Sequence, residues 1–276
     1  MSTTKPGGEV ATKPAAALVP VADFSGDANA GFEKAGRDDL AIPFLTILQG
    51  LSPEVKRSEG AYIDGALEGM VLNTVSKEVI DTQKVRLVVV PCAYSRAFVE
   101  WRVREKGGGF VAEHPDTTPL QHQTTRDERG RDILPNGNQL NDTRTFYVLL
   151  LDEDNGTASP AVLTMTSTQI KKSKQWLMQQ NMLKLNNGAG SYTPPMYASR
   201  WEVDTVPESN EKGSWFGWKF THDGYLAGPT DPLFIAAKAF YQSVTQGKVK
   251  ADLAKAEGDA PKTQKVNPDT GEPMED

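Results

Sequence analysis

The chain has 276 residues, of which 30 are Lys or Arg and 36 are Asp or Glu, so its formal net charge is -6. This length suits one sizeable domain with appendages or two small domains, and the negative balance excludes a nucleic-acid binder that is basic all over, though not one with a local basic face. A hydrophobic content of 38% and a mean hydropathy of -0.47 are low for a wholly compact chain and indicate disordered ends.

The cysteine content and the apolar runs predict where the protein works. Cys92 is the only cysteine, which excludes a disulfide framework and a thiolate zinc cluster and favours a reducing compartment. The apolar stretch at residues 15–21 is short and interrupted by Pro20, and no run approaches the roughly 18 apolar residues of a membrane span. We therefore expect a cytoplasmic protein with no membrane partner.

The ends of the chain differ in composition from its middle. Residues 1–36 are rich in Ala, Pro, Gly, Thr and Lys without periodicity, and residues 247–276 are charged and contain proline. Both are predicted to be disordered, as an N-terminal arm and a C-terminal tail. Between them, residues 37–246 are predicted to form a single domain. Its first part, residues 37–51, suits either a short helix or a docked extended segment, and a hairpin is expected around residues 73–77.

The stretch at residues 85–106 is the most informative. An apolar run at residues 87–90 leads through Pro91 into strict alternation, which predicts a long strand with two different faces. One face, with Val99 and Trp101, is expected to be core. The other carries aromatic rings among guanidinium groups: Tyr94, Arg96, Phe98, Arg102 and Arg104. Such a face offers stacking surfaces and fixed cations to a single-stranded nucleic acid; the alternative is a mixed solvent face whose rings are covered by the N-terminal segment.

The remaining elements follow in order. A long polar loop is expected over residues 107–143, because apolar residues are sparse there. A hairpin with strands at 145–151 and 159–165 turns at the DEDNG segment. A helix of about 17 residues begins at Ser167 or Thr168, with Ile170, Leu177, Met178 and Met182 expected along its buried side, and ends before Asn186, Asn187 and Gly188. Strands at 196–206 and 214–222 precede a final helix at 232–244.

This order of elements predicts the fold class. Strand, strand, strand, helix, strand, strand is the order of the OB fold. We predict a mainly β (α+β) protein with an OB-like five-stranded Greek-key barrel, a helix between strands 3 and 4, an added N-terminal hairpin and a C-terminal helix. The ligand loops of that fold would correspond to residues 107–143 and 207–213.

Several segments also resemble a known family. IPFLTILQGLSPEVK, GMVLNTVSKEVID, VVVPCAYSRAFVEW, GGGFVAEH and TSTQIKKSKQWL are similar to segments of single-stranded DNA-binding proteins encoded in the replication and recombination regions of tailed bacteriophages. The resemblance covers residues 42–241 and implies coating of single-stranded DNA without sequence preference, with phage or host replication and recombination proteins as partners. The dense acidic tail with a terminal aromatic, found in many such proteins, is lacking: Glu272, Glu275 and Asp276 are sparse.

The predicted nucleic-acid-binding residues combine these patterns. Lysines at a helix start are unfavourable for the helix dipole, which hints at a phosphate partner, although a solvated helix face is the alternative. Among Trp201, Trp215 and Trp218, one is expected to face the ligand. The full set is Tyr94, Arg96, Phe98, Arg102, Arg104, Lys106, Phe110, Lys171, Lys172, Lys174 and Trp215.

Signals of an enzyme are weak. Asp152, Glu153 and Asp154 sit in the expected hairpin turn, the three histidines are scattered, and no glycine-rich loop opens a helix. We therefore predict no catalysis, cofactor or metal. Two alternatives to DNA binding are kept: a protein-interaction module that binds or inhibits a host enzyme, and, ranked last, a nuclease. An oligomer is compatible with the sequence.

Overall fold

The computed structural model describes residues 26, 30–31, 41–211 and 213–255. Residues 1–40 and residues 41–276 are separate units, and every helix and strand described below belongs to the second. Most of the predicted arm, and residues 256–276 of the predicted tail, lie outside the described residues. No helix among the described residues is long and apolar enough to cross a membrane.

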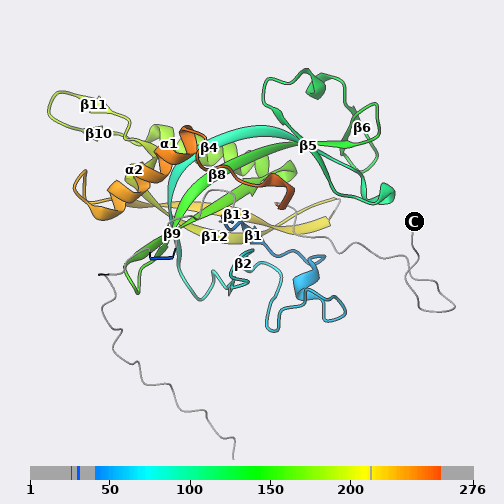
Figure 1. Cartoon of the computed structure of the whole chain (residues 1–276), viewed down its shortest axis with the longest axis horizontal. Coiled ribbons are helices and arrows are strands. Elements are labelled where there is room, and N and C mark those ends of the chain that lie inside the picture. The colour runs from blue at the N-terminus through cyan, green and yellow to red at the C-terminus, as the bar shows by residue number, and fades with distance from the viewer. Residues whose placement is uncertain (1–25, 27–29, 32–40, 212, 256–276) are drawn as a thin grey trace, which may run out of the picture. The chain divides into compact units, whose positions relative to one another are not determined.

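The second unit is built on a curled antiparallel sheet with two α-helices (Figure 1). Its main strands neighbour one another in the order β13-β12-β4-β8-β9. The prediction of a mainly β fold with a barrel-like sheet is therefore confirmed, and each predicted strand lies at the expected place. The bounds are β4 Leu87–Trp101, β8 Gln139–Asp152, β9 Thr157–Met165, β12 Ser199–Asn210 and β13 Gly213–Tyr225, with α1 Ile170–Met182 and α2 Pro232–Thr245.

The end strands β9 and β13 are bridged by the segment that carries β1 (Leu45–Ile47). On one side, Val162 N donates to Pro43 O at 2.9 Å, and Phe44 forms a parallel bridge with Val162. On the other side, the Gln49 side-chain amide donates to Phe216 O and accepts from Phe216 N, both at 2.9 Å. Among the described residues no ladder joins β9 to β13 directly, so this segment takes up backbone groups that a closed barrel would pair.

A small second sheet lies next to this segment. β1 pairs with β2 (Val71–Asn73), which pairs with β3 (Val79–Ile80). The Asn73 carboxamide accepts from Val75 N and Ser76 N, both at 3.1 Å, and fixes the turn. The predicted hairpin around residues 73–77 is confirmed. Of the two options for residues 37–51, the extended one holds for the described part, residues 41–51.

Side chains on the two faces of the sheet form two cores. The inner core contains Phe146, Trp176 and Trp201 and is covered by α1, whose Trp176 stacks on Phe220 with ring centroids 3.9 Å apart. The outer core contains Tyr147 and is covered by α2 and by the chain after it. Both faces of β4 and β8 are therefore buried along much of their length, which explains the unbroken apolar runs in these strands.

The buried face of α1 differs from the predicted one. Ser173, Trp176 and Gln180 are buried, whereas Met178 and Met182 are 58% and 68% exposed. The prediction was wrong for Met178 and Met182, because these side chains were weighted above Trp176, which buries more surface than either. Leu177 does pack against the inner core. The helix is also shorter than predicted, since a 3-10 turn, η5 (Ser167–Gln169), precedes it and the hairpin of β10 (Leu185–Asn186) and β11 (Ser191–Tyr192) follows it.

The segment predicted as a long loop is an ordered extension of the sheet, here called the lobe and defined as residues 102–138. It contains η3 Arg104–Lys106, β5 Phe110–Pro115, η4 Pro119–His122, β6 Thr125–Arg126 and β7 Asp132–Ile133. β5 pairs with the end of β4, and Leu134 packs with Phe98 and Leu140. The prediction of a loop was wrong because a few apolar residues, such as Leu134, are enough to pack this segment against the sheet. The lobe lies at the end of β4 and β8 that is remote from α2 (Figure 1).

The chain after α2 stays on the outer core. The Asp231 carboxylate caps α2 by accepting from Leu233 N at 2.8 Å. Ala251 N then donates to the Tyr147 hydroxyl at 3.1 Å, and Ala251 and Leu253 are buried. The described part of the predicted tail, residues 247–255, is therefore packed against the sheet.

Candidate nucleic-acid interface

A charged band crosses the inner face of the sheet beyond the inner core. Arg96 on β4 lies opposite Arg144 on β8, and both guanidinium groups donate to Asp142. Arg144 Nη1 also donates to the Tyr94 hydroxyl at 3.3 Å. Burial raises the pKa of Asp142, but the hydrogen bonds from the two arginines outweigh burial and lower it overall. The cations of this band are thus already paired with a carboxylate.

Phe98 does not lie on an open face. Phe98 is only 6% exposed, because Leu134 and Leu140 pack on its ring. The Arg96 guanidinium lies 4.9 Å from the centroid of the same ring. The expectation that this ring lies on an accessible face was wrong, because the lobe covers it. A base can stack on Phe98 only if the lobe moves away.

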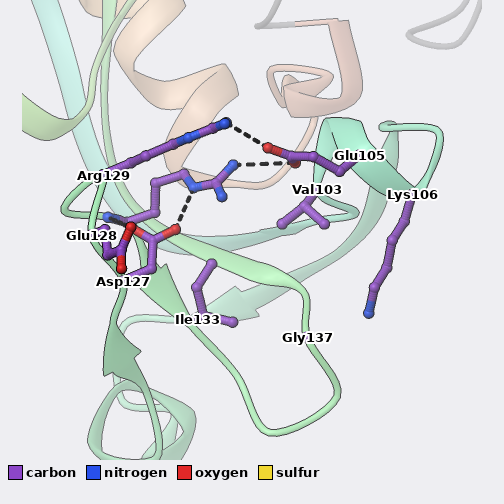
Figure 2. A pocket seen from close by; sticks show the side chains of 9 residues that line it. Val103, Glu105, Lys106, Asp127, Glu128, Arg129, Ile133 and Gly137 are labelled. Atoms are coloured by element: carbon purple, nitrogen blue, oxygen red, sulfur yellow. Dashed lines mark hydrogen bonds and ion pairs between the residues drawn. The ribbon is translucent and has the colours of Figure 1, made fainter.

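Four of the predicted nucleic-acid-binding residues lie just after the end of β4 in the chain. Arg102 and Lys106 are exposed, Arg104 belongs to η3, and Phe110 packs edge-on against Trp101 with ring centroids 5.8 Å apart. Lys106 lines an open pocket of about 460 Å³. Figure 2 shows Lys106 extending alone, whereas four other charged groups of that pocket are joined: Arg129 and Arg131 pair with Glu105, and Arg131 also pairs with Asp127.

A second open pocket of about 470 Å³, here called the groove, lies between the lobe and the tip of the β12–β13 hairpin. One wall is the β6–β7 hairpin with Arg126 and Arg129, whose side chains are 72% and 69% exposed. The opposite wall is the β12–β13 tip with Trp215, and the start of η5 completes it. The lining residues are Arg126, Arg129, Gly130, Ser167, Thr168, Asn210, Gly213, Ser214 and Trp215.

Glu208 links Trp215 to the lysine helix. Trp215 Nε1 donates to Glu208 Oε2 at 3.0 Å, and Lys172 Nζ lies 2.6 Å from Glu208 Oε1. Burial raises the pKa of Glu208, but the hydrogen bonds from Lys172 and Trp215 and the charges of Lys172 and Lys171 lower it overall. Lys171 and Lys174 are exposed, and neither has an ion-pair partner within the described part of the chain.

The start of α1 is held firmly against this wall. The Gln169 side-chain oxygen accepts from Trp218 N at 3.0 Å, so η5 is tied to β13. Ser167 has a φ of 47°, an uncommon value for a residue with a side chain, and it lines the groove. Strained backbone of this kind occurs more often at binding sites than elsewhere.

The predicted residues therefore fall into three places. The first place is the groove: Trp215 lines it, Lys172 is connected to Trp215 through Glu208, and Lys171 and Lys174 are on the same helix as Lys172. The second is the charged band and the space under the lobe, with Tyr94, Arg96 and Phe98. The third is the far end of β4, with Arg102, Arg104, Lys106 and Phe110. Of the three tryptophans, Trp201 and Trp218 are 2% exposed, which leaves Trp215 as the accessible one. Sequence reasoning missed Arg126, Arg129 and Glu208; the RDERGRD run at residues 126–132 was the available signal.

No group of three or more His, Cys, Asp or Glu side chains suited to a metal ion occurs in the described residues. Cys92 is buried, and burial raises the pKa of its thiol to about 12. His114 instead donates to the buried Glu100 at 2.9 Å. Cys92 thus belongs to the outer core, and His114 connects the lobe to Glu100 on β4.

The chain is similar to a known protein family. The family model described as "Pam3 phage gp34-like protein" matches residues 11–250, which is most of the chain. The chain belongs to this family. The bacteriophage part of the resemblance is therefore confirmed. No curated protein matches the chain, and no solved structure matches it.

Proposed function

We propose that the protein binds single-stranded DNA in the groove, without sequence preference, and that its curled sheet is an OB-like barrel. The observation that carries the proposal is the position of the groove. It lies between the connection from β4 to β8 and the β12–β13 hairpin. In an OB-like order these are the connections between strands 1 and 2 and between strands 4 and 5, where OB folds bind oligonucleotides.

The chemistry of the groove fits this ligand. Trp215 offers an aromatic surface, and stacking of a base on such a ring is worth about 1–3 kcal/mol for any base. Arg126 and Arg129 line the groove and supply cations for phosphates, and the exposed Lys171 follows the groove-lining Thr168 by three residues. Ser167 and Thr168 add hydroxyl groups that can donate to phosphate oxygens. Nothing in this set selects a particular base, which supports binding independent of sequence.

A non-catalytic protein of this kind would coat exposed single strands, protect them from nucleases and assist phage DNA replication or recombination. The family to which the chain belongs is one of phage proteins, which fits this role. Phage or host replication and recombination proteins are the partners that such a role implies.

The test is a titration with oligo-dT, followed by tryptophan fluorescence at several salt concentrations. The affinity should fall linearly with the logarithm of the salt concentration, because phosphate contacts release counterions. Parallel titrations with duplex DNA and with RNA define the preference. Absence of binding, or binding that does not depend on salt, contradicts the proposal.

One observation favours a protein-interaction module instead. Met178 and Met182 lie four residues apart on α1 and are 58% and 68% exposed, next to the β10–β11 hairpin with its 43% exposed Tyr192. Flexible methionines are common on surfaces that bind proteins. Capture of a host protein from nuclease-treated lysate that is lost in Met178→Lys, combined with no DNA binding, would favour this function.

A further inference from the structure

The Glu208 carboxylate has an unusual environment for an acidic group. Each of its oxygens faces a different donor: Lys172 Nζ lies 2.6 Å from Oε1, and Trp215 Nε1 lies 3.0 Å from Oε2. The side chains of Glu208 and Lys172 are each 24% exposed. An anion is thus held next to Trp215, which lines the groove, by a cation and an indole N–H.

The backbone also leaves room for this anion. A Cβ atom added at Gly217 would lie 2.5 Å from Glu208 Oε2 and 2.9 Å from its Cδ. Glycine at this position of β13 therefore lets the carboxylate lie directly over the strand.

We propose that Lys172, the Trp215 indole N–H and the Gly217 backbone form a phosphate site that Glu208 occupies in the free protein. The inference rests on the proposed function and specifies one contact within it. A phosphodiester has two non-bridging oxygens, as a carboxylate has two oxygens, and it can accept from the same two donors. When DNA binds, a phosphate takes the place of the carboxylate, which swings into solvent.

The surroundings favour such an exchange. Lys171 lies close enough to lower the pKa of Glu208 through its charge. The two positive charges of Lys171 and Lys172 therefore exceed the one negative charge of the Glu208 carboxylate. Lys174, one turn along α1, is exposed as well. A partly exposed ion pair contributes little stability on its own. Glu208 is therefore a competitor that a strand with several phosphates can displace.

The test compares two isosteric variants that change the net charge equally. Glu208→Gln removes the competing charge at the groove and keeps an oxygen that can accept from Trp215. The control is Glu113→Gln on β5, whose carboxylate pairs with Lys250 at 2.9 Å away from the groove. We expect Glu208→Gln to bind oligo-dT about fivefold more tightly than the natural protein, and Glu113→Gln to bind as the natural protein does. The double variant Glu208→Gln/Lys172→Gln should lose the gain.

The outcomes separate the two proposals. If the natural protein binds oligo-dT but Glu208→Gln binds equally or more weakly, the phosphate site is wrong and the proposed function stands. If neither protein binds oligo-dT, the proposed function fails, and a titration with inorganic pyrophosphate then tests whether the phosphate site exists. Quenching of Trp215 fluorescence in Glu208→Gln, but not in the natural protein, supports the site. Absence of quenching in Glu208→Gln overturns it.

A measurement on the unaltered protein covers the case in which Glu208→Gln does not fold. The indole N–H resonance of Trp215, assigned with Trp215→Phe, should shift when oligo-dT saturates the protein, because its acceptor changes from carboxylate to phosphate. A resonance that stays in place while DNA binds overturns the inference.

Discussion

Arg96 and Asp142 are joined by two hydrogen bonds, from Nε and Nη2 of the arginine to the two oxygens of the carboxylate, each 2.9 Å long. Arg144 Nη2 adds a third, at 3.1 Å. The Asp142 side chain is 20% exposed and that of Arg144 only 10%. One carboxylate therefore balances two arginines between the inner core and the lobe.

Asp142→Asn should destabilise the protein by about 1–3 kcal/mol, because it leaves two partly buried guanidinium groups without their anion. Urea unfolding at neutral pH measures this change. Asp132→Asn is the matched control: its carboxylate lies 3.6 Å from Arg126, with side chains 49% and 72% exposed, and the change should stay within about 0.5 kcal/mol. Equal effects of the two variants would contradict this account.

The strands were predictable from the sequence because local signals agree along them. Alternation and apolar runs mark β4 and β13, and the DEDNG turn fixes the β8–β9 hairpin. The faces of β4 were less predictable. Phe98 and Glu100 follow the pattern of a polar face, yet the lobe buries both. A periodic pattern shows which residues share a face, but distant segments decide what covers that face.

At the candidate site, too, contacts between segments distant in the chain could not be predicted from local sequence patterns. Trp215 and Lys172 were found from residue type and spacing, but their common partner Glu208 is 36 residues from Lys172 in the chain. Arg126 and Arg129 were overlooked because a charge-rich segment with few apolar residues suggests a mobile loop. Their position at the groove depends on the packing of Leu134 against Phe98, which no local pattern announces.

Trp176→Ala should cost about 3–5 kcal/mol of stability, since the indole is fully buried among Phe146, Trp201 and Phe220. Trp176→Phe should cost less, because Nε1 of Trp176 has no hydrogen-bond partner to lose and a phenyl ring can still stack on Phe220. Met178→Ala on the exposed side of α1 should change stability by less than about 0.5 kcal/mol. Thermal and urea unfolding of the three variants rank these effects, and a reversed order of Trp176 and Met178 would contradict the observed helix face.

Stability should fall in acid partly through Glu100. Burial raises the pKa of this carboxyl, but hydrogen bonds from Asn138, Asn136 and His114 lower it overall. A carboxyl whose pKa is lower in the folded state stabilises the fold above its ordinary value of 4.5, and this contribution is lost as the pH falls through the folded-state pKa. The loss therefore lies below about pH 4.5.

Glu100→Gln should accordingly lower stability at pH 7 and show a smaller further loss between about pH 6 and pH 3 than the natural protein. The exposed Glu78→Gln, beside the β2–β3 turn, is the control. Urea midpoints across this pH range give the comparison. An unchanged acid dependence in Glu100→Gln would show that other carboxyls carry the loss.

Cys92 should resist thiol reagents in the native protein. Burial raises its pKa to about 12, so almost no thiolate exists at neutral pH, and the side chain is inaccessible in the outer core. Reaction with a chromogenic disulfide should become fast only in denaturant, at the concentration at which the protein unfolds. Cys92→Ser should leave DNA affinity unchanged. Rapid labelling without denaturant would contradict the observed burial.

Arg126 and Arg129 provide the sharpest test of where DNA binds. Both line the groove, and their side chains are 72% and 69% exposed. Replacing both with Gln should weaken oligo-dT binding and reduce the magnitude of the log–log salt slope by about 1.4, since each phosphate contact on a single strand contributes about 0.7.

The matched control is Lys238→Gln/Lys248→Gln, which removes two exposed positive charges on α2 and just after it, on the opposite face of the sheet. This control should keep the salt slope of the natural protein, because a change in net charge alone does not remove a phosphate contact. If the two double variants lose slope equally, the DNA is attracted by overall charge and the groove is not its site. If only Arg126→Gln/Arg129→Gln loses slope, and Trp215→Ala weakens binding without changing the slope, then the lobe holds the phosphates and the β12–β13 tip stacks the bases.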